Sequence, residues 1–394
     1  MTMALEGIRV LDLTVYQQGP FASTLLADMG ADVIKIEAPD TGDLGRLSGD
    51  AYFGYLNRNK RAITIDLKNE AGRETFLQLV ERSDIFHNNL RPGVLKRLNL
   101  TYPVVAERNP QIIMSNATGW GHLGPDAEQE LGSFDGLAQS RGGLFSINGT
   151  VDSGPHPAPV PLADQFGAVI AAYGMLVALV ERTRSGQGQE INSSLYGSQL
   201  CMQGFGITGS LWRQRNPQLR PANSSPRLAT YQCSDGLLTL AGGAPDRWWP
   251  AFCEAMGVAE CAEGAYTENA ADPDWCRRTY TRLNEVFGTA DRETWMQRLS
   301  PRFHVQPVRT YLEIGQDQQA WDNQYLVNVT NREGETVPMV GLPVHLSRTP
   351  GSVRSIAPEM GQHTNEVLGD FGFTPEAIAG LRAAGAFGSD TASK

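Results

Sequence analysis

Short apolar runs alternate with longer amphipathic runs along the N-terminal part of the chain. The apolar runs have the β-branched and leucine content of buried strands, and they lie at 7–14, 31–38, 61–67, 84–90 and 111–119. The runs between them predict helices at 19–30, 69–83 and 101–110. Strands that alternate with helices favour a mostly parallel sheet with helices on both faces. The pattern predicts an α/β fold, with a large Rossmann-like domain over residues 1–205.

The amino-acid composition of the chain changes after this domain. Residues 206–230 are rich in Arg, Pro, Asn and Ser, as expected of a linker. A hairpin-like strand and helical segments follow, which predict a small α+β domain over 231–330. Residues 331–394 form an extended return segment and a C-terminal amphipathic helix, which we expect to pack on the large domain. The last residues, 389–394, are expected to fray.

One long helix is predicted at 166–182, where nearly every position is apolar, so we expect it to be buried. Asp164 lies at its N-terminus. The exposed N–H groups and the positive end of the helix dipole favour an ionised carboxylate there. Position alone favours a capping role over a catalytic one. The two roles are compatible, because an ionised carboxylate is also a competent nucleophile.

Composition narrows the function classes. The formal net charge of −10 disfavours nucleic acid and anionic membranes as partners. The five cysteines make an odd count without a CxxC pair, which suits a reducing, cytoplasmic compartment. The N-terminus has no signal-peptide pattern, and the longest apolar run is shorter than a bilayer span. The six histidines are scattered without ligand spacing, so we expect no metal site.

Basic residues gather at 58–61 and 91–97, each next to a predicted strand end, where open α/β sheets bind ligands. Side chains that would suit phosphates are Arg58, Lys60, Arg61, Lys68, Arg91 and Arg97. The alternative is a solvated surface with ordinary ion pairs. The turn after the first strand has one glycine and lacks GxGxxG, so the NAD fingerprint is missing. A Walker A loop and a GxSxG elbow are missing as well.

Taken together, these segments resemble the family III CoA-transferases over nearly the whole chain. The order and spacing of the matching segments are specific, although no single one is decisive. They lie at 5–14, 19–43, 56–73, 88–98, 109–125, 134–143, 161–191 and 357–372. The last two read PLADQFGAVIAAYGMLVALVERTRSGQGQEI and APEMGQHTNEVLGDFG.

The resemblance implies a site and a mechanism. The family's catalytic aspartate falls on Asp164, which would attack an acyl-CoA to give an acyl-aspartyl anhydride and, after exchange with an acceptor carboxylic acid, an aspartyl-CoA thioester. Backbone N–H groups near the start of its helix would stabilise the oxyanion. The family's contacts with CoA fall on Tyr16, Gln17, Gln18, Ile65, Lys68, Asn89, Leu90, Arg91 and Arg97. The family's interlocked homodimer is also implied.

The chain departs from the family pattern in several places. Ala38 stands where some relatives carry a basic residue, so the adenosine phosphate would be held differently. Residues 220–230 stand where oxalate-type enzymes have a glycine-rich mobile loop. Neither donor nor acceptor acid follows from the sequence. Residues considered for an acid pocket are Trp120, Tyr196, Arg220 and Arg227.

Three other functions are alternatives to a CoA-transferase. The 2-methylacyl-CoA racemases of the same superfamily pair the aspartate with a histidine, and Ser133 stands at that place here. Serine is not a general acid–base near neutral pH, which argues against a racemase. A catalytically silent CoA-binding protein, with Asp164 as a mere cap, stays open. An NAD-dependent oxidoreductase is disfavoured by the missing fingerprint.

Overall fold

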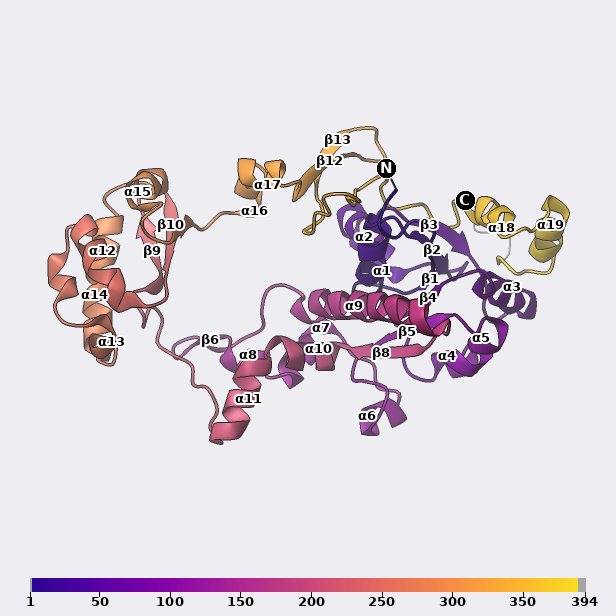
Figure 1. Ribbon diagram of the computed structural model, residues 1–394, viewed down its shortest axis with the longest axis horizontal. Coiled ribbons are helices and arrows are strands. Elements are labelled where there is room, and N and C mark those ends of the chain that lie inside the picture. Colours follow the sequence, from indigo (N-terminus) through magenta and orange to yellow (C-terminus); the bar gives the residue numbers. More distant parts are fainter. Residues whose placement is uncertain (1, 389–394) are drawn as a thin grey trace. The chain divides into compact units, whose positions relative to one another are not determined.

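The computed structural model describes residues 2–388 and confirms the predicted α/β class. The main sheet has six parallel strands in the order β3-β2-β1-β4-β5-β8 (Figure 1). These strands are β1 (Arg9–Leu13), β2 (Asp32–Glu37), β3 (Arg61–Thr64), β4 (Ile85–Asn88), β5 (Ile113–Thr118) and β8 (Glu190–Ser194). Residues 389–394, for which fraying is predicted, lie outside the described part.

Alternate side chains of each strand face opposite layers, as the pleat requires. On one face, Val10 and Val33 pack with α1 (Gln18–Asp28) and α9 (Leu162–Ser185). On the other, Leu11 and Ile34 pack with two helices from the first third of the chain and two from its end. These are α3 (Glu70–Val80), α5 (Tyr102–Arg108), α18 (Thr364–Asp370) and α19 (Pro375–Ala383). Apolar burial on both faces explains the strand-like runs in the sequence.

Contacts divide the chain into two compact units. Within residues 2–388, the first comprises 2–145, 157–216 and 318–388, and the second comprises 146–156 and 217–317. The second unit contains an antiparallel sheet and its own apolar core. Its main elements are β9 (Leu228–Cys233), β10 (Gly236–Ala241), β11 (Val305–Pro307), α12 (Trp249–Met256), α14 (Pro273–Phe287) and α15 (Arg292–Leu299).

Several elements of the first unit do not appear in the sequence prediction. They include α2 (Asp50–Asn57), α4 (Val94–Arg97), α7 (Asp135–Arg141), α10 (Leu195–Met202), α11 (Gly204–Arg213) and the hairpin β12 (Leu326–Thr330) and β13 (Thr336–Val340). Helix α11 occupies the start of the stretch that we predicted as a linker.

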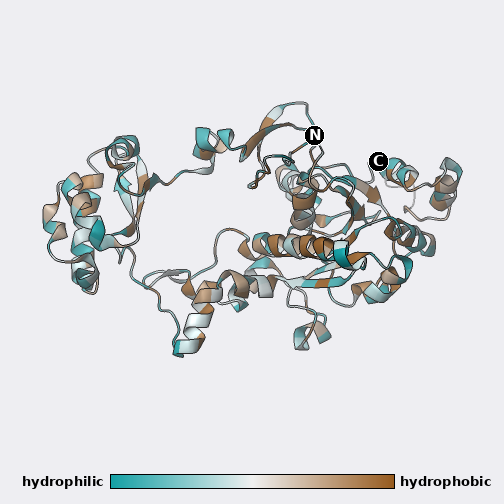
Figure 2. Ribbon diagram, in the orientation of Figure 1, coloured by the Kyte–Doolittle hydropathy of each residue, from teal (hydrophilic) through white to brown (hydrophobic). Residues whose placement is uncertain are grey.

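The prediction that the long helix is buried is wrong for one side of α9. Its small residues pack against α1, β5 and β8, but Val169, Tyr173, Leu176, Val177 and Val180 are exposed. This happens because a single chain covers only one side of a helix that is apolar all round. Figure 2 shows the hydrophobic colouring along α9. The helix is long and apolar enough to cross a membrane by length and composition alone, a test that core helices also pass.

The basic cluster at 58–61 is structural, so its interpretation as a phosphate site is wrong. Arg58 pairs with Asp28 at 2.8 Å and Lys60 pairs with Asp12 at 2.8 Å, and all four side chains are buried. Arg61 is satisfied by carboxylates of Asp32, Glu366 and Asp370. The solvated-surface alternative also fails for Arg58 and Lys60, because burial removes both from solvent.

We expect Lys60→Met to lower the free energy of unfolding by about 3 kcal/mol, because it leaves the buried Asp12 carboxylate without its partner. Urea denaturation followed by circular dichroism measures this change. Arg282→Met, which breaks an exposed pair with Glu260, is the matched control and should cost less than about 1 kcal/mol. Equal losses in the two variants would contradict the assignment of Lys60 to a desolvated pair.

Candidate active site

A cavity of about 290 Å³ lies at the carboxyl ends of β1, β4 and β5. Strands β1 and β4 are neighbours whose following helices cover opposite faces, and this switch point is where open α/β sheets bind ligands. The walls are Val15, Tyr16, Gln17, Gln18, Asn89, Leu90, Arg91, Pro92, Val94, Ala117, Thr118, Gly119, Leu131, Gly132, Ser133, Phe134, Asp164 and Leu195.

The cavity brings together most of the residues that the resemblance implies. Six of the predicted CoA contacts line it with Asp164, and these are Tyr16, Gln17, Gln18, Asn89, Leu90 and Arg91. The others lie elsewhere: Ile65 belongs to the apolar core, and the backbone N–H of Lys68 donates to Asp66. Arg97 pairs with Glu130 at 2.7 Å on the surface. A role for these three in binding CoA stays a prediction.

Hydrogen bonds and a buried ion pair hold the loop after β1 in place. The Asn89 side chain accepts from Val15 N (2.9 Å) and donates to Val15 O (2.8 Å), which ties the loops after β1 and β4 together. Asp43 Oδ1 accepts from the N–H of Tyr16, whose φ of 62° lies in the strained left-handed region. Lys35 Nζ bonds both Thr14 O and Asp43 Oδ2 while completely buried. The loop therefore presents its cavity-lining residues in a fixed geometry.

Helix α9 is capped by Asp135 and not by Asp164. Asp135 Oδ1 accepts from Ala163 N (2.7 Å) and Asp164 N (3.1 Å), and Gln139 Nε2 donates to its other oxygen. The N-cap position, Pro161, makes no side-chain cap. The capping interpretation of Asp164 is thus wrong, as is the expectation that the first N–H groups of this helix are available to an oxyanion. The capping residue is the aspartate of FDGLAQ, which lies 29 residues before Asp164, so the sequence next to α9 does not reveal this cap.

The expectation that the helix terminus keeps Asp164 ionised also fails. Burial, and next the nearby charge of Asp135, raise the pKa of Asp164 to about 7. The terminal N–H groups that would have stabilised its charge are occupied by Asp135. A carboxylate that is only half ionised near neutrality is more basic than usual, which is typical of functional sites.

Tyr52 is a site residue that the sequence did not reveal. Its hydroxyl lies 3.4 Å from Gln17 Oε1. Burial, followed by the charges of Asp164 and Asp43, raises the pKa of Tyr52 to about 12. Tyr52 therefore stays a neutral hydrogen-bond donor beside the cavity. It lies on α2, an element that the sequence pattern did not predict.

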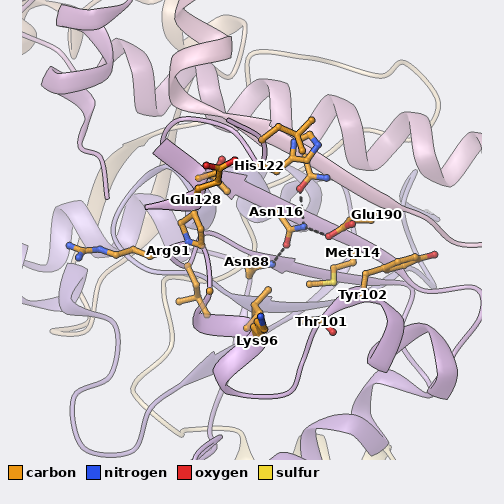
Figure 3. Close-up of a pocket in the computed structure, with 18 of the residues that line it drawn as sticks. Asn88, Arg91, Lys96, Thr101, Tyr102, Met114, Asn116, His122, Glu128 and Glu190 are labelled. Atoms are coloured by element: carbon orange, nitrogen blue, oxygen red, sulfur yellow. Dashed lines mark hydrogen bonds between the residues drawn. The ribbon is translucent and has the colours of Figure 1, made fainter. Parts of the chain in front are cut away.

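A second cavity of about 400 Å³ shares Leu90, Arg91, Pro92 and Thr118 with the first (Figure 3). Its floor carries asparagines in register on neighbouring strands, Asn88, Asn116 and Asn192. Asn88 Nδ2 donates to Asn116 Oδ1 (2.7 Å), whose amide donates to Asn192 Oδ1 (3.1 Å) and Glu190 Oε1 (2.8 Å). This amide ladder gives the second cavity a polar floor.

The residues considered for an acid pocket do not line the Asp164 cavity. Trp120 and Tyr196 contact each other and lie against the Arg141 guanidinium. Arg220 and Arg227 belong to the second unit, where Arg227 donates to Gly242 O. Among residues 2–388, no group of three or more His, Cys, Asp or Glu side chains is arranged to hold a metal ion.

Comparison with known proteins adds to this geometry. The sequence profile of the family described as "CoA-transferase family III" matches residues 5–364. A succinyl-CoA:mesaconate CoA-transferase of Haloarcula hispanica is 34% identical, with 94% of this chain and 96% of that protein aligned. A succinyl-CoA–D-citramalate CoA-transferase of Chloroflexus aurantiacus is 32% identical (96% and 97%). A formyl-CoA:oxalate CoA-transferase of Afipia carboxidovorans is 29% identical (98% of each).

Solved structures show the same architecture. The crystal structure of a CAIB/BAIF family protein from Brucella suis superposes with a TM-score of 0.83 at 28% identity. That alignment covers 94% of this chain and 100% of the other.

We expect Asp164→Asn to raise the melting temperature at pH 8 by roughly 2 °C or more, as measured by thermal denaturation. The raised pKa means that the folded state holds the Asp164 proton more tightly than the unfolded chain. Wild-type stability therefore falls as pH rises from about 4 to about 7, and the variant removes this loss. The difference should vanish near pH 4. Asp40→Asn, at an exposed position, is the control and should change nothing. A lower melting temperature for Asp164→Asn at pH 8 would restore the capping role.

Proposed function

Because this chain belongs to CoA-transferase family III, we propose that it transfers CoA between acyl-CoA and a carboxylic acid through a covalent intermediate on Asp164. One observation carries the proposal. Asp164 faces a cavity at the switch point of the sheet, and the capping of its helix is performed by Asp135. The carboxylate is therefore not needed for the fold. It stands beside Gln18 and beside Tyr16, Gln17 and Asn89–Arg91, and we propose the latter residues as CoA contacts.

The reaction consists of acyl exchanges without redox change. An ionised Asp164 oxygen attacks the thioester carbonyl, the C–S bond breaks, and an anhydride and CoA thiolate result. The thiolate attacks the Asp164 carbonyl, which releases the donor acid and leaves an aspartyl-CoA thioester. The acceptor carboxylate attacks this thioester, which releases the thiolate again and leaves a second anhydride between Asp164 and the acceptor acid. Attack of the thiolate on the acceptor carbonyl forms the new acyl-CoA and restores the Asp164 carboxylate.

The raised pKa of Asp164 suits a nucleophile. A carboxylate with a pKa near 7 is more basic than an ordinary one, so it forms a bond to carbon more readily once ionised. Burial also limits the access of water, which would hydrolyse an anhydride.

We propose succinyl-CoA as donor and a short dicarboxylic acid as acceptor. This choice is supported by the names of relatives, which act on mesaconate, citramalate and oxalate. The two relatives named above for succinyl-CoA are 34% and 32% identical to this chain over most of its length.

The alternatives are weaker against the same geometry. A racemase requires a second acid–base group at the substrate α-carbon, and the cavity wall carries Ser133 at that position. A silent CoA-binding protein was supported by the capping interpretation of Asp164, which the contacts of Asp135 remove.

We propose that the protein is a homodimer, interlocked as in the family, and that it is cytoplasmic. The dimer is supported by exposed apolar side chains on α9 and on the adjoining α10–α11 segment, where Phe205 and Trp212 are 92% and 84% exposed. Large exposed apolar side chains on connected elements are typical of an interface. The cytoplasmic location is supported by the cysteines, which are all free thiols.

Incubation with succinyl-CoA should give a mass adduct on Asp164, detected by intact-protein and peptide mass spectrometry and cleaved by hydroxylamine. The adduct should form about tenfold more slowly at pH 6 than at pH 8, because the pKa of about 7 leaves most of Asp164 protonated at pH 6. Asp164→Ala should form none. An adduct at another residue, or an equal adduct in Asp164→Ala, would refute the assignment.

Light scattering after size exclusion should give a mass of twice 42.9 kDa. The double variant Val177→Glu/Val180→Glu places charge on the exposed face of α9 and should shift the protein toward the monomer. Thr281→Glu, at an exposed position of α14, is the control and should leave the mass unchanged. A monomeric wild-type protein would exclude the dimer.

A further inference from the structure

Of the helices that begin at the cavity, the two longest are α1 and α9, and of these two only α9 has its first N–H groups satisfied. Those of α9 are bonded to Asp135. At the start of α1, the N-cap residue Gln17 makes no side-chain cap, and the backbone N–H groups of Gln18 and Gly19 bond to no other residue in the described range. The positive end of α1 is thus available to a ligand oxygen, whereas that of α9 is not.

The Gln18 side chain marks the same place. Its residue is only 4% exposed and lines the cavity, and its Nε2 has no hydrogen-bond partner among residues 2–388. The amide reaches α9 where Gly167 leaves room, since a Cβ there would lie 2.9 Å from Gln18 Nε2. Residues 164 and 167 lie on the same face of a helix. An unpaired donor is therefore held beside the nucleophile.

The backbone that carries Gln18 is fixed before any ligand arrives. His87 Nε2 donates to Gly19 O at 3.2 Å, and burial lowers the pKa of His87, which keeps the ring neutral. A Cβ on Gly19 would lie 2.5 Å from Thr14 Cβ, so the first turn of α1 packs directly on the preceding loop. A donor that does not need to reorganise is the kind that stabilises developing charge.

We propose that the Gln18 amide donates the hydrogen bond that stabilises the substrate oxyanion when Asp164 attacks. The inference rests on the proposed function. As the Asp164 oxygen bonds to the thioester carbon, the carbonyl electron pair moves onto its oxygen, which accepts from Gln18 Nε2 and the α1 terminus. When the C–S bond breaks, the pair returns and the thiolate leaves, so no proton is transferred.

A neutral amide is better suited to stabilising an oxyanion during the reaction than to binding the carboxylate of a substrate before it. Arginine would bind a substrate carboxylate more strongly, but it would do so equally before and during the reaction. Buried amide atoms without partners occur elsewhere, at Gln139 Oε1 and at both amide atoms of Gln199, but these side chains do not line the cavity. Gln18 alone among these three combines the missing partner with the cavity and a helix terminus.

The experiment follows the rate of Asp164 acylation by succinyl-CoA in rapid-quench mass spectrometry, together with the Kd of CoA from calorimetry. Gln18→Met keeps the side-chain length without a donor, and Gln18→Glu keeps the shape with acceptors only. Both should acylate about 100-fold more slowly with an unchanged Kd for CoA. Gln199→Met, which removes a buried unpartnered amide outside the cavity, is the matched control and should acylate at the wild-type rate.

The outcomes separate this inference from the proposed function. If wild type forms no adduct, the proposed function fails. If wild type forms the adduct and both Gln18 variants acylate within threefold of its rate, the function stands and the role of Gln18 is refuted. A loss of CoA affinity as large as the loss of rate would also refute it, because Gln18 would then bind the ground state. Slow acylation with unchanged affinity supports it.

Discussion

The order of the parallel strands is the constraint on which the site depends. Because β1 and β4 are neighbours and the helices after them cover opposite faces, their connections separate and leave a space at the carboxyl edge. The topology alone brings residues 15–18 beside 89–92, although they are far apart in sequence. Buried polar contacts then fix these loops. Asn89 bonds the loop after β4 to the loop after β1, and the ion pair of Lys35 and Asp43 supports the loop after β1. Helix α9 delivers Asp164 to the same point from a distant part of the chain.

The division of work between two aspartates determines the chemistry. Asp135 satisfies the terminal N–H groups of α9, so it takes the stabilising position that Asp164 would otherwise occupy. Asp164 is left partly buried near a like charge, with a raised pKa. The same arrangement shows why helix position is a poor guide to function here. A carboxylate in the first turn can be a cap or a nucleophile, and only its neighbour decides.

Sequence periodicity was sufficient for the elements with apolar residues at regular spacing. Strands β1 to β5 and helices α1, α3 and α5 lie where the pattern predicts them, because each buries an apolar face. Edge strand β8 has the polar sequence EINSS, and α7 and α2 are short, so none gave a periodic signal. The site residues came largely from the family resemblance. The roles of Asp135 and Tyr52 were not predictable, because each depends on a contact across the fold. The prediction of a phosphate site at 58–61 failed for the same reason, because composition does not reveal the buried partners of Arg58 and Lys60.

Two groups in the empty cavity are in unfavourable surroundings, the Asp164 carboxylate and the Gln18 amide. The proposed reaction gives both more favourable ones. Burial disfavours the Asp164 anion, whereas an anhydride or thioester at the same atom carries no charge. The desolvation that raises the pKa therefore favours the covalent intermediates relative to the free carboxylate. The unpaired Gln18 amide gains its partner only when a carbonyl oxygen enters, and gains most when that oxygen is negative. Such a site, whose polar groups lack partners while it is empty and gain them during the reaction, needs rigid surroundings. The buried ion pairs beneath the β1 loop supply that rigidity.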